Sequence, residues 1–554
     1  MLAGSNGTST HGWDTVYAVR FSDLNKTIIS HKTSPTAFEQ VINDPDEGEE
    51  YRVSGQFGDW QLTVGGDGKN VYLAVPILKS TLVTNRTYDC SLITLTIEVN
   101  LAWVSSAPAA TAGMGARHVL QLKDTAPERA AAGATAHASD RVAIVGVDWG
   151  SNQLSELKHA AYRALLGNWL AEHVGAFRHV FSTLDLNQEL SADAQALQWL
   201  MPTGTPLYAV VDLDESLEKS MFGVLCMTEN RPAPGNHQLD PFAIPDGANS
   251  GFLINAERVL DKMLLPGMPH LFIGNVSVQD FTLSPDGLSL QNAKRLQFAD
   301  QRLPSSYLYP LGHTVQPFID AGNFRLEMSG GKVNMTMDGV HFEFSPGITV
   351  SIVHTSSVRL TLNENRQFRM DLTGPANTSA NISTALWVTL TEVTAGIIAS
   401  VILSAAGGIL GASVSGGGAV VRSGTIATVR TVITIVKDSV KGAVSNLGAR
   451  AFQAAASTLK GGAGEIGSLI YANWAKIVGT IIGGTIGGSI GTISSIITLI
   501  AKDKASEIPT LDEFGTQAMS PIGWPNTTPD GFELVSGQLN GALQIGFNLA
   551  YKHD

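Results

Sequence analysis

The chain has 554 residues, of which 44% are hydrophobic and only 15% charged, and its formal net charge is −13. Binding along nucleic acid requires clustered lysine and arginine, and the sequence has no basic stripe, so this class of partner is excluded. The same acidic balance argues against broad electrostatic attraction to anionic lipid, which depends on polybasic segments. The length is sufficient for several domains with extensive cores.

The first half of the chain alternates between helical and strand patterns. Apolar residues at spacings of three and four predict a helix over 13–30. Strict alternation over 91–103 predicts one long antiparallel strand that is half buried. Its inward face is expected to pack on a helix or to line an apolar groove, and it consists of Ile93, Leu95, Ile97, Val99, Leu101 and Trp103. Further strands are expected at 117–122, 141–148 and 207–213.

Two more helices are predicted before the pattern returns to strands. Residues 152–181 have one apolar side that includes Trp169, which indicates a single long helix. Residues 249–265 resemble a capped helix that ends at Pro266 and Gly267. From 275 to 373, apolar residues recur at every second position between short polar breaks, so this region is expected to form long antiparallel strands.

Residues 386–502 have the composition of a helical block rich in Gly, Ala and Ile. Two segments inside it, 393–421 and 477–501, contain no charged residue. Small residues recur every fourth position in the second segment, at Gly479, Gly483, Gly487 and Gly491. Because residues four apart share one helix face, this row is expected to allow close packing of another backbone.

The uncharged segments allow two interpretations. Each exceeds the roughly 20 residues that a membrane-spanning helix needs, which is consistent with a hairpin that inserts into a bilayer. Serine and threonine are frequent in both, however, and no aromatic belt flanks either segment. The sequence therefore favours packing within a soluble protein without a stable membrane span, and pore formation stays as the alternative.

No constellation of residues indicates catalysis. His173 and His179 are six residues apart in the predicted helix, so they do not share a face as metal ligands would. The segment from Gly487 to Gly491 matches a nucleophile-elbow pattern but lacks the strand-to-helix context that the elbow requires. Cys90 and Cys226 are expected to be buried structural thiols. We therefore expect a protein that is not an enzyme and that has no metal or other cofactor.

The amino terminus has neither a basic region nor an apolar core typical of a secretory signal. We therefore expect synthesis in the cytoplasm, with any release to the outside taking place by another route.

Four short stretches, in order along the chain, resemble one known family. They are His11–Tyr17 with Asn25 and Lys26, Phe252–Ile254 through Leu264–Gly267, Pro521–Pro525, and Leu539–Gly546. They are similar to the clostridial forty-seven-kilodalton family, which is encoded with OrfX proteins beside toxin genes. This resemblance implies a bacterial accessory protein that binds lipid or assembles with companion toxin-cluster proteins or with itself. It provides no catalytic residues.

The resemblance also implies a fold of the tubular lipid-binding (TULIP) type. The expected class is α+β, with elongated domains in which long curved antiparallel strands wrap around long helices, plus the Gly/Ala-rich helical block. We expect an amino-terminal domain at 1–230, a second β-rich domain at 231–385, the helical block at 386–504, and a closing loop and strand at 505–554. The residues expected to line an apolar groove or to contact lipid are Ile93, Leu95, Ile97, Val99, Trp103 and Trp169.

Overall fold

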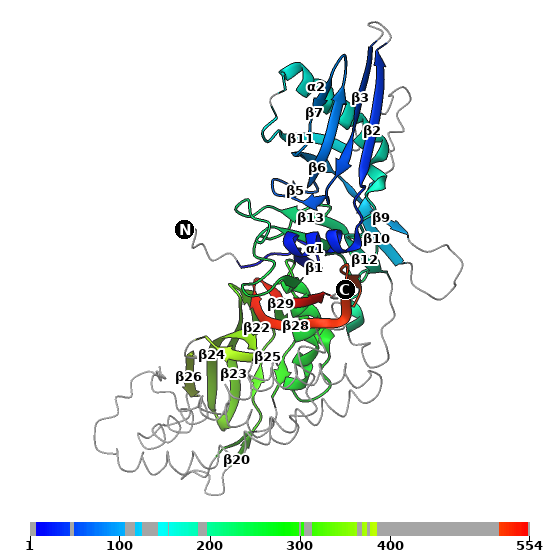
Figure 1. The fold of residues 1–554 in the computed structure, drawn as a ribbon. Coiled ribbons are helices and arrows are strands. Elements are labelled where there is room, and N and C mark those ends of the chain that lie inside the picture. The colour runs from blue at the N-terminus through cyan, green and yellow to red at the C-terminus, as the bar shows by residue number, and fades with distance from the viewer. Residues whose placement is uncertain are drawn as a thin grey trace, which may run out of the picture.

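The computed structural model describes residues 7–44, 49–105, 117–123, 142–152, 154–186, 197–298, 301–303, 313–362, 368–373, 377–384 and 520–551. Within these residues the chain forms a series of sheets stacked along one long axis, as Figure 1 shows. We call the three largest parts, from the top of Figure 1 to the bottom, the upper lobe, the central layer and the lower sheet. Every pair of named strands in the described part is antiparallel, which confirms the expected strand arrangement.

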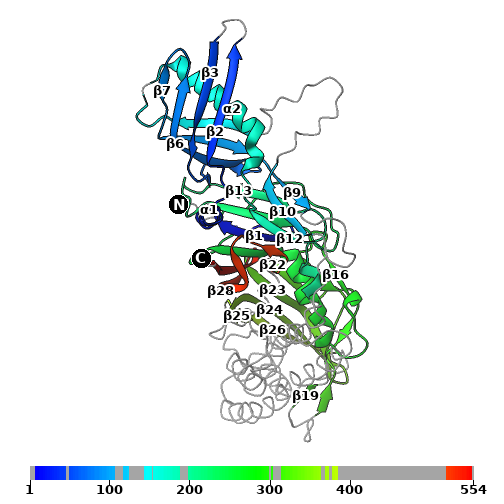
Figure 2. The ribbon, with the colours of Figure 1, turned by 45° about the vertical axis from the view of Figure 1, so that its right-hand side comes forward.

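The upper lobe is a seven-stranded sheet covered by a single long helix. Its strands are β2 (Ala37–Asp44), β3 (Glu49–Phe57), β4 (Gln61–Leu62), β6 (Val71–Val83), β7 (Thr87–Asp89), β8 (Ile93–Val99) and β11 (Val142–Asp148). The helix α2 (Glu156–His173) contacts β2, β3 and β11, and Figure 2 shows it lying along the sheet. The strand expected at 141–148 is confirmed. The helix expected over 152–181 is shorter, because the short 3-10 helix η2 (Val174–Ala176) ends it.

The central layer is a seven-stranded sheet that joins distant parts of the chain. In spatial order its strands are β28 (Thr527–Asn540), β29 (Ala542–Tyr551), β15 (Ser250–Ile254), β1 (Thr15–Arg20), β14 (Met221–Cys226), β13 (Leu207–Val211) and β5 (Asp67–Gly68). The carboxyl-terminal strands therefore complete a sheet that contains the first strand of the chain. The domain division at 230 stays a prediction, although this sheet contains strands from both sides of that position.

Two predicted helices in the central layer are partly wrong. The residues expected as a helix over 13–30 form β1 and then the helix α1 (Phe21–His31). The region 249–265 forms β15, followed by α3 (Ala256–Arg258), the π-helix η4 (Val259–Leu264) and the 3-10 helix η5 (Leu265–Leu271). Both strands are buried on both faces, so their apolar residues do not alternate and resemble a helical pattern.

A small four-stranded sheet lies beside the central layer. Its strands are β27 (Ile522–Gly523), β12 (Ser182–Asp185), β10 (Arg117–Leu122) and β9 (Leu101–Ser105). The strand expected at 117–122 is confirmed. The single strand expected over 91–103 is wrong, because the chain breaks at Asn100 and β9 pairs in this sheet while β8 stays in the upper sheet. The Asn100 carbonyl accepts a hydrogen bond from the Lys123 amide, in register with the β9–β10 pairs, so the pairing with β10 already begins at Asn100.

The lower sheet has nine strands, and a separate two-stranded ribbon accompanies it. The sheet contains β16 (Phe281–Leu283), β17 (Ser289–Asn292), β18 (Leu296–Gln297), β21 (Phe318–Ile319), β22 (Phe324–Ser329), β23 (Lys332–Ser345), β24 (Ile348–Leu362), β25 (Phe368–Leu372) and β26 (Asn377–Thr384). The 3-10 helix η6 (Val278–Asp280) precedes it, and the ribbon pairs β19 (Gln301–Leu303) with β20 (His313–Val315). The long strands expected between 275 and 373 are confirmed by β23 and β24.

Several predictions fall outside the described residues. They are the helical block at 386–502, the uncharged segments 393–421 and 477–501, and the glycine row from Gly479 to Gly491. Among the residues that the structure does describe, none of the helices combines the length and the hydropathy needed to cross a bilayer.

Candidate functional site

The apolar seam of the upper lobe lies between the inner face of its sheet and α2. Ile93, Leu95, Ile97 and Val99 on β8 are almost fully buried, as the alternation predicts. The helix contributes a buried row to the same core, which consists of Tyr162, Leu165, Leu166, Trp169 and Leu170. Polar contacts fix its position, since the Tyr162 hydroxyl donates to Ser80 Oγ on β6 at 2.9 Å.

Aromatic rings fill the end of the seam nearest the central layer. The Trp169 ring lies 5.1 Å from Phe57 and 6.1 Å from Phe38, measured between ring centroids. Trp60 stacks on Phe177 with centroids 5.3 Å apart. Since Phe38 and Phe57 belong to β2 and β3, these contacts hold the carboxyl-terminal half of α2 against the sheet.

The aromatic contacts continue from the seam into the central layer. Phe177 lies 6.2 Å from Phe181, which in turn stacks on Phe222 of β14 at 5.7 Å. Phe222 contacts Trp524, ahead of the carboxyl-terminal strands, at 6.4 Å. The upper lobe and the central layer therefore share one continuous apolar core.

The structure brings together five of the six residues predicted to line a groove. Ile93, Leu95, Ile97 and Val99 share the seam with Trp169, whereas Trp103 lies on β9 in the four-stranded sheet, opposite Leu120. The separation results from the break at Asn100, which the alternating pattern does not reveal.

Three indole N–H groups in and around this core have no hydrogen-bond partner among the described atoms. They belong to Trp60, Trp103 and Trp524, and each nitrogen is buried. Buried donors of this kind are uncommon, because leaving one unsatisfied costs about 1–3 kcal/mol. They are polar groups without a described partner in a largely apolar region.

A buried ionic cluster lies around Asp14, within the stretch that resembles the clostridial family. The Asp14 carboxylate accepts hydrogen bonds from the Thr228 amide at 2.9 Å, from the Thr228 hydroxyl at 3.0 Å and from Arg231 Nη1 at 2.6 Å. Arg231 also donates to Glu257 at 2.7 Å. The neighbouring Trp13 indole donates to Asn236 at 3.0 Å. The hydrogen bonds of Trp13 and Asp14 therefore hold the start of β1 against the segments that follow β14 and β15.

The cluster continues through Glu229, which pairs with Arg258 and with Lys262. Burial acts to raise the pKa of Glu229, but the hydrogen bonds from Arg258 and Lys262 outweigh it and hold that pKa below its usual value. Sequence reasoning missed this cluster, because its members are separated by more than 200 residues along the chain, as the Asp14–Arg231 hydrogen bond shows.

The cysteines are buried and unpaired, which confirms the expectation of structural thiols. Burial raises the pKa of Cys90 to about 11 and raises that of Cys226 still further. A thiol with such a pKa is almost entirely protonated at neutral pH and is a poor nucleophile.

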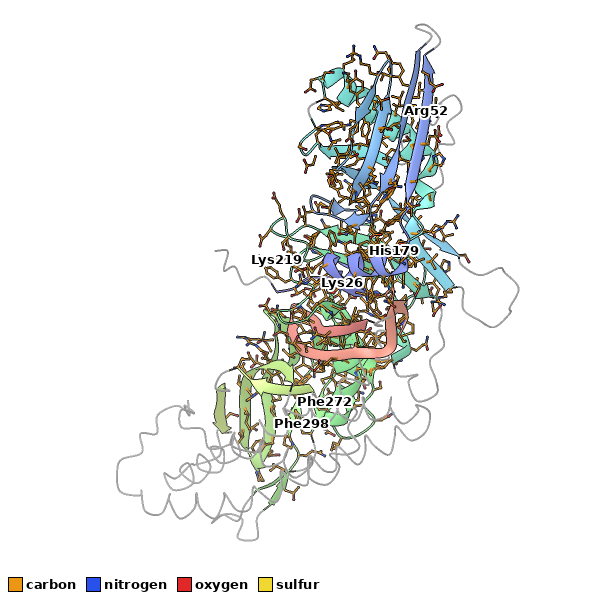
Figure 3. All side chains as sticks on the ribbon, viewed as in Figure 1. Lys26, Arg52, His179, Lys219, Phe272 and Phe298 are labelled. Carbon is orange, nitrogen blue, oxygen red and sulfur yellow. The ribbon has the colours of Figure 1, made fainter. Side chains whose placement is uncertain are left out.

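Within the described residues, no group of three or more His, Cys, Asp and Glu side chains is placed to hold a metal ion. The absence of a cofactor and of catalysis stays a prediction. His173 is exposed and stacks on Trp169, with ring centroids 4.9 Å apart. His179 is fully buried and, as Figure 3 shows, lies between the upper lobe and the central layer.

Comparison of the sequence with known proteins identifies relatives over most of the chain. The family model described as OrfX-like, for the proteins OrfX2, OrfX3 and P47, matches residues 10–450. OrfX3 of Paraclostridium bifermentans is 31% identical over 307 residues, which cover 50% of this chain and 58% of that protein. OrfX3 of Clostridium botulinum (strain Kyoto / Type A2) is 29% identical over 335 residues, covering 56% and 65%. The matched region spans less than two thirds of either relative.

Comparison with solved structures shows that the fold is shared with P47 proteins. P47 from C. botulinum A2 superposes with a TM-score of 0.58 at 14% identity, covering 98% of each chain. P47 of C. botulinum E1 gives 0.55 at 13% identity, covering 98% of this chain and all of the other. A lipopolysaccharide-binding protein reaches only 0.24, which is too low to support the TULIP assignment. Because the family model matches residues 10–450, this chain belongs to the OrfX-like family of OrfX2, OrfX3 and P47 proteins.

Proposed function

We propose that this chain is a non-enzymatic accessory protein of a bacterial toxin-type gene cluster, and that it binds a lipid acyl chain along the apolar seam of a TULIP-like upper lobe. Membership of the OrfX-like family supports the accessory role. Such a protein is made in the cytoplasm and acts with companion proteins or with copies of itself, in some cases after release from the cell.

The observation that carries the lipid proposal is the geometry of the seam. A long helix lies across the inner face of a sheet, and the side chains between them are almost entirely apolar. Ligand sites for apolar molecules typically have such linings with a few polar groups that fix orientation. Separating the helix slightly from the sheet creates an elongated apolar space without breaking backbone hydrogen bonds of either element.

The buried indole N–H groups support a ligand with oxygen acceptors at one end. Trp60 lies at the aromatic end of the seam, and its Nε1–H has no partner among the described atoms. An ester or amide carbonyl of a lipid would accept this hydrogen bond, while the acyl chain would extend beside Leu95 and Ile97.

Uptake of a fluorescent fatty acyl probe tests the proposal. Leu95→Trp places a larger side chain inside the seam, whereas Thr96→Trp places the same side chain on the opposite face of the same strand. We expect Leu95→Trp to weaken probe binding by about tenfold or more, which corresponds to about 1.4 kcal/mol. Thr96→Trp should bind as the wild type does. Thermal melts of both variants establish that each is folded, since overpacking alone costs about 1–3 kcal/mol.

Equal binding by the two variants would contradict the seam as the site. Failure of the wild type to take up any acyl probe would contradict lipid binding and leave assembly with companion proteins. Release of dye from liposomes at low pH would favour the alternative, a membrane-inserting component that uses 393–421 and 477–501, both outside the described residues.

A further inference from the structure

His179 lies where two connections meet: one leads from the central layer to the upper lobe, and the other leads from the upper lobe to the four-stranded sheet beside the central layer. Residues 32–36 lead from α1 to β2, and residues 177–181 lead from η2 to β12. The Arg178 amide donates to the Thr33 carbonyl at 3.1 Å, so the two connections are joined by their backbones. His179 follows directly and is fully buried between them.

The hydrogen bonds around the ring define which nitrogen carries the proton. Thr27 Oγ1 donates its own proton to the Leu24 carbonyl at 2.7 Å, so it can only accept from His179 Nε2, at 3.4 Å. His179 Nδ1 is then unprotonated and accepts from Thr33 Oγ1 at 3.2 Å. Both ring nitrogens of a neutral imidazole therefore have a hydrogen-bond partner in this site. A second ring proton on Nδ1 would have no acceptor unless the Thr33 hydroxyl reoriented.

The surroundings of the ring disfavour a positive charge. Phe181 packs edge-on against it at 5.0 Å and Phe177 lies 6.1 Å away. The titratable group that faces His179 from α1 is His31, and the two ring centroids are 6.4 Å apart. Arg178, which precedes His179 in the chain, is a cation. Within the described residues, the hydrogen bonds and ring contacts of His179 are to threonine, phenylalanine and histidine side chains, none of which would neutralise an imidazolium.

We propose that His179 is an acid-sensitive lock: in its neutral form it holds the two connections together, and its protonation loosens the junction so that the upper lobe moves relative to the central layer. This device goes beyond the proposed lipid binding and does not depend on it. His179 lies beside the series of aromatic contacts that runs from Phe177 through Phe181 to Phe222.

The direction of the pH dependence follows from the pKa. Burial, with a smaller contribution from His31, lowers the pKa of His179 from 6.5 to about 3 in the folded protein. A group with a depressed pKa stabilises the closed junction fully above the pKa of the open state, which is about 6.5. That contribution decreases as the pH falls from 6.5 towards 3, because the open state then binds a proton that the closed state excludes.

Hydrogen exchange of individual amides tests the lock in the full chain. After correction for intrinsic exchange, we expect protection of the Arg178 amide to fall by about 100-fold between pH 7.5 and pH 4.5, which is about tenfold per pH unit below 6.5. His179→Gln, which does not titrate, should remove most of this dependence. His173→Gln, which changes an exposed histidine, should leave it unchanged.

The Ala18 amide, in the middle of β1, serves as an internal reference for acid effects elsewhere in the protein. An acid response of Arg178 equal to that of Ala18, or equal in wild type and His179→Gln, would overturn the proposal. If His179→Gln does not fold, ring carbon chemical shifts of labelled histidine in the wild type decide instead. The lock requires His179 to stay neutral down to about pH 4, and titration near pH 6.5 would contradict it.

Discussion

The upper lobe and the lower sheet fill their interiors in different ways. In the upper lobe a single helix, α2, covers the inner face of the sheet. In the lower sheet four phenylalanine rings pack together, with Phe272 4.9 Å from Phe298 and 5.6 Å from Phe324, and with Phe281 beside them; Figure 3 labels two of these residues. The upper lobe also has interlocking rings, among them Phe57 and Trp169, but these lie at one end of its seam, and the buried β8 side chains that face α2 are aliphatic. This difference is why we assign lipid binding to the upper lobe.

The largest expected effect comes from removing the ring that joins α2 to the sheet. Trp169→Ala should destabilise the protein by about 3–5 kcal/mol, because it deletes a buried aromatic side chain and leaves a cavity. Phe324→Ala in the lower sheet should cost a similar amount for the same reason. Only Trp169→Ala should also change acyl-probe binding, which is measured alongside denaturant unfolding. Loss of probe binding in both variants would remove the functional distinction between the two regions.

The next effect concerns the buried ionic cluster that joins β1 to the segments that follow β14 and β15. Asp14→Ala leaves Arg231 without its main buried partner, and we expect a loss of about 3 kcal/mol, the lower end of the range because Arg231 is partly exposed. Lys219→Ala is the control, since its pair with Asp214 lies on the surface and its loss should change stability by less than about 0.5 kcal/mol. Equal effects in chemical denaturation would mean that the Asp14 cluster is not structurally important.

A pH titration tests His354, the buried histidine of the lower sheet. Burial lowers the pKa of His354, on β24 of the lower sheet, from 6.5 to about 4. The stability it contributes is complete above pH 6.5 and falls as the pH decreases, by about 2–3 kcal/mol at pH 4.5. The difference in unfolding free energy between wild type and His354→Gln should follow this curve. A difference that does not vary with pH would show that His354 titrates alike in both states.

The smallest expected effect tests the packing of β8. Ile97→Val removes one buried methyl group and should cost about 0.5–1.5 kcal/mol, measured by thermal or urea unfolding. Thr96→Ser, which removes a methyl group from the opposite face of the same strand, should cost less. A cost for Ile97→Val no greater than that for Thr96→Ser would indicate that the seam is loosely packed before any ligand enters.

The sequence is informative where one face of an element is buried and the other is exposed. The inward residues of β8 and the strands β23 and β24 follow this rule and were predicted. The rule fails for β1 and β15, because both faces of these strands are covered and alternation disappears. It also fails at Asn100, where the strand passes into another sheet while its buried residues keep the same period.

The candidate sites show the same limit. Four seam residues were predicted because they share the alternating pattern of one strand, and Trp169 because it lies on the apolar side of a predicted helix. Trp103 was misplaced by the break at Asn100. The lock around His179 depends on Thr27 and Thr33, which are about 150 residues away in the sequence. No local pattern indicates such a contact, and from the sequence we considered His179 only as a metal ligand and rejected that role. Asp14 lay inside a recognised motif, yet its role depends on Arg231 and Thr228.

Native mass spectrometry of the gently purified full chain tests the central claim, that the apolar seam binds an acyl chain, most directly. The account predicts a bound species whose mass exceeds that of the protein by one lipid, and predicts its loss from Leu95→Trp but not from Thr96→Trp. A single bare-protein mass, together with no uptake of an added acyl probe, would contradict the claim. The seam would then be an ordinary core, and the chain would act only through its companion proteins.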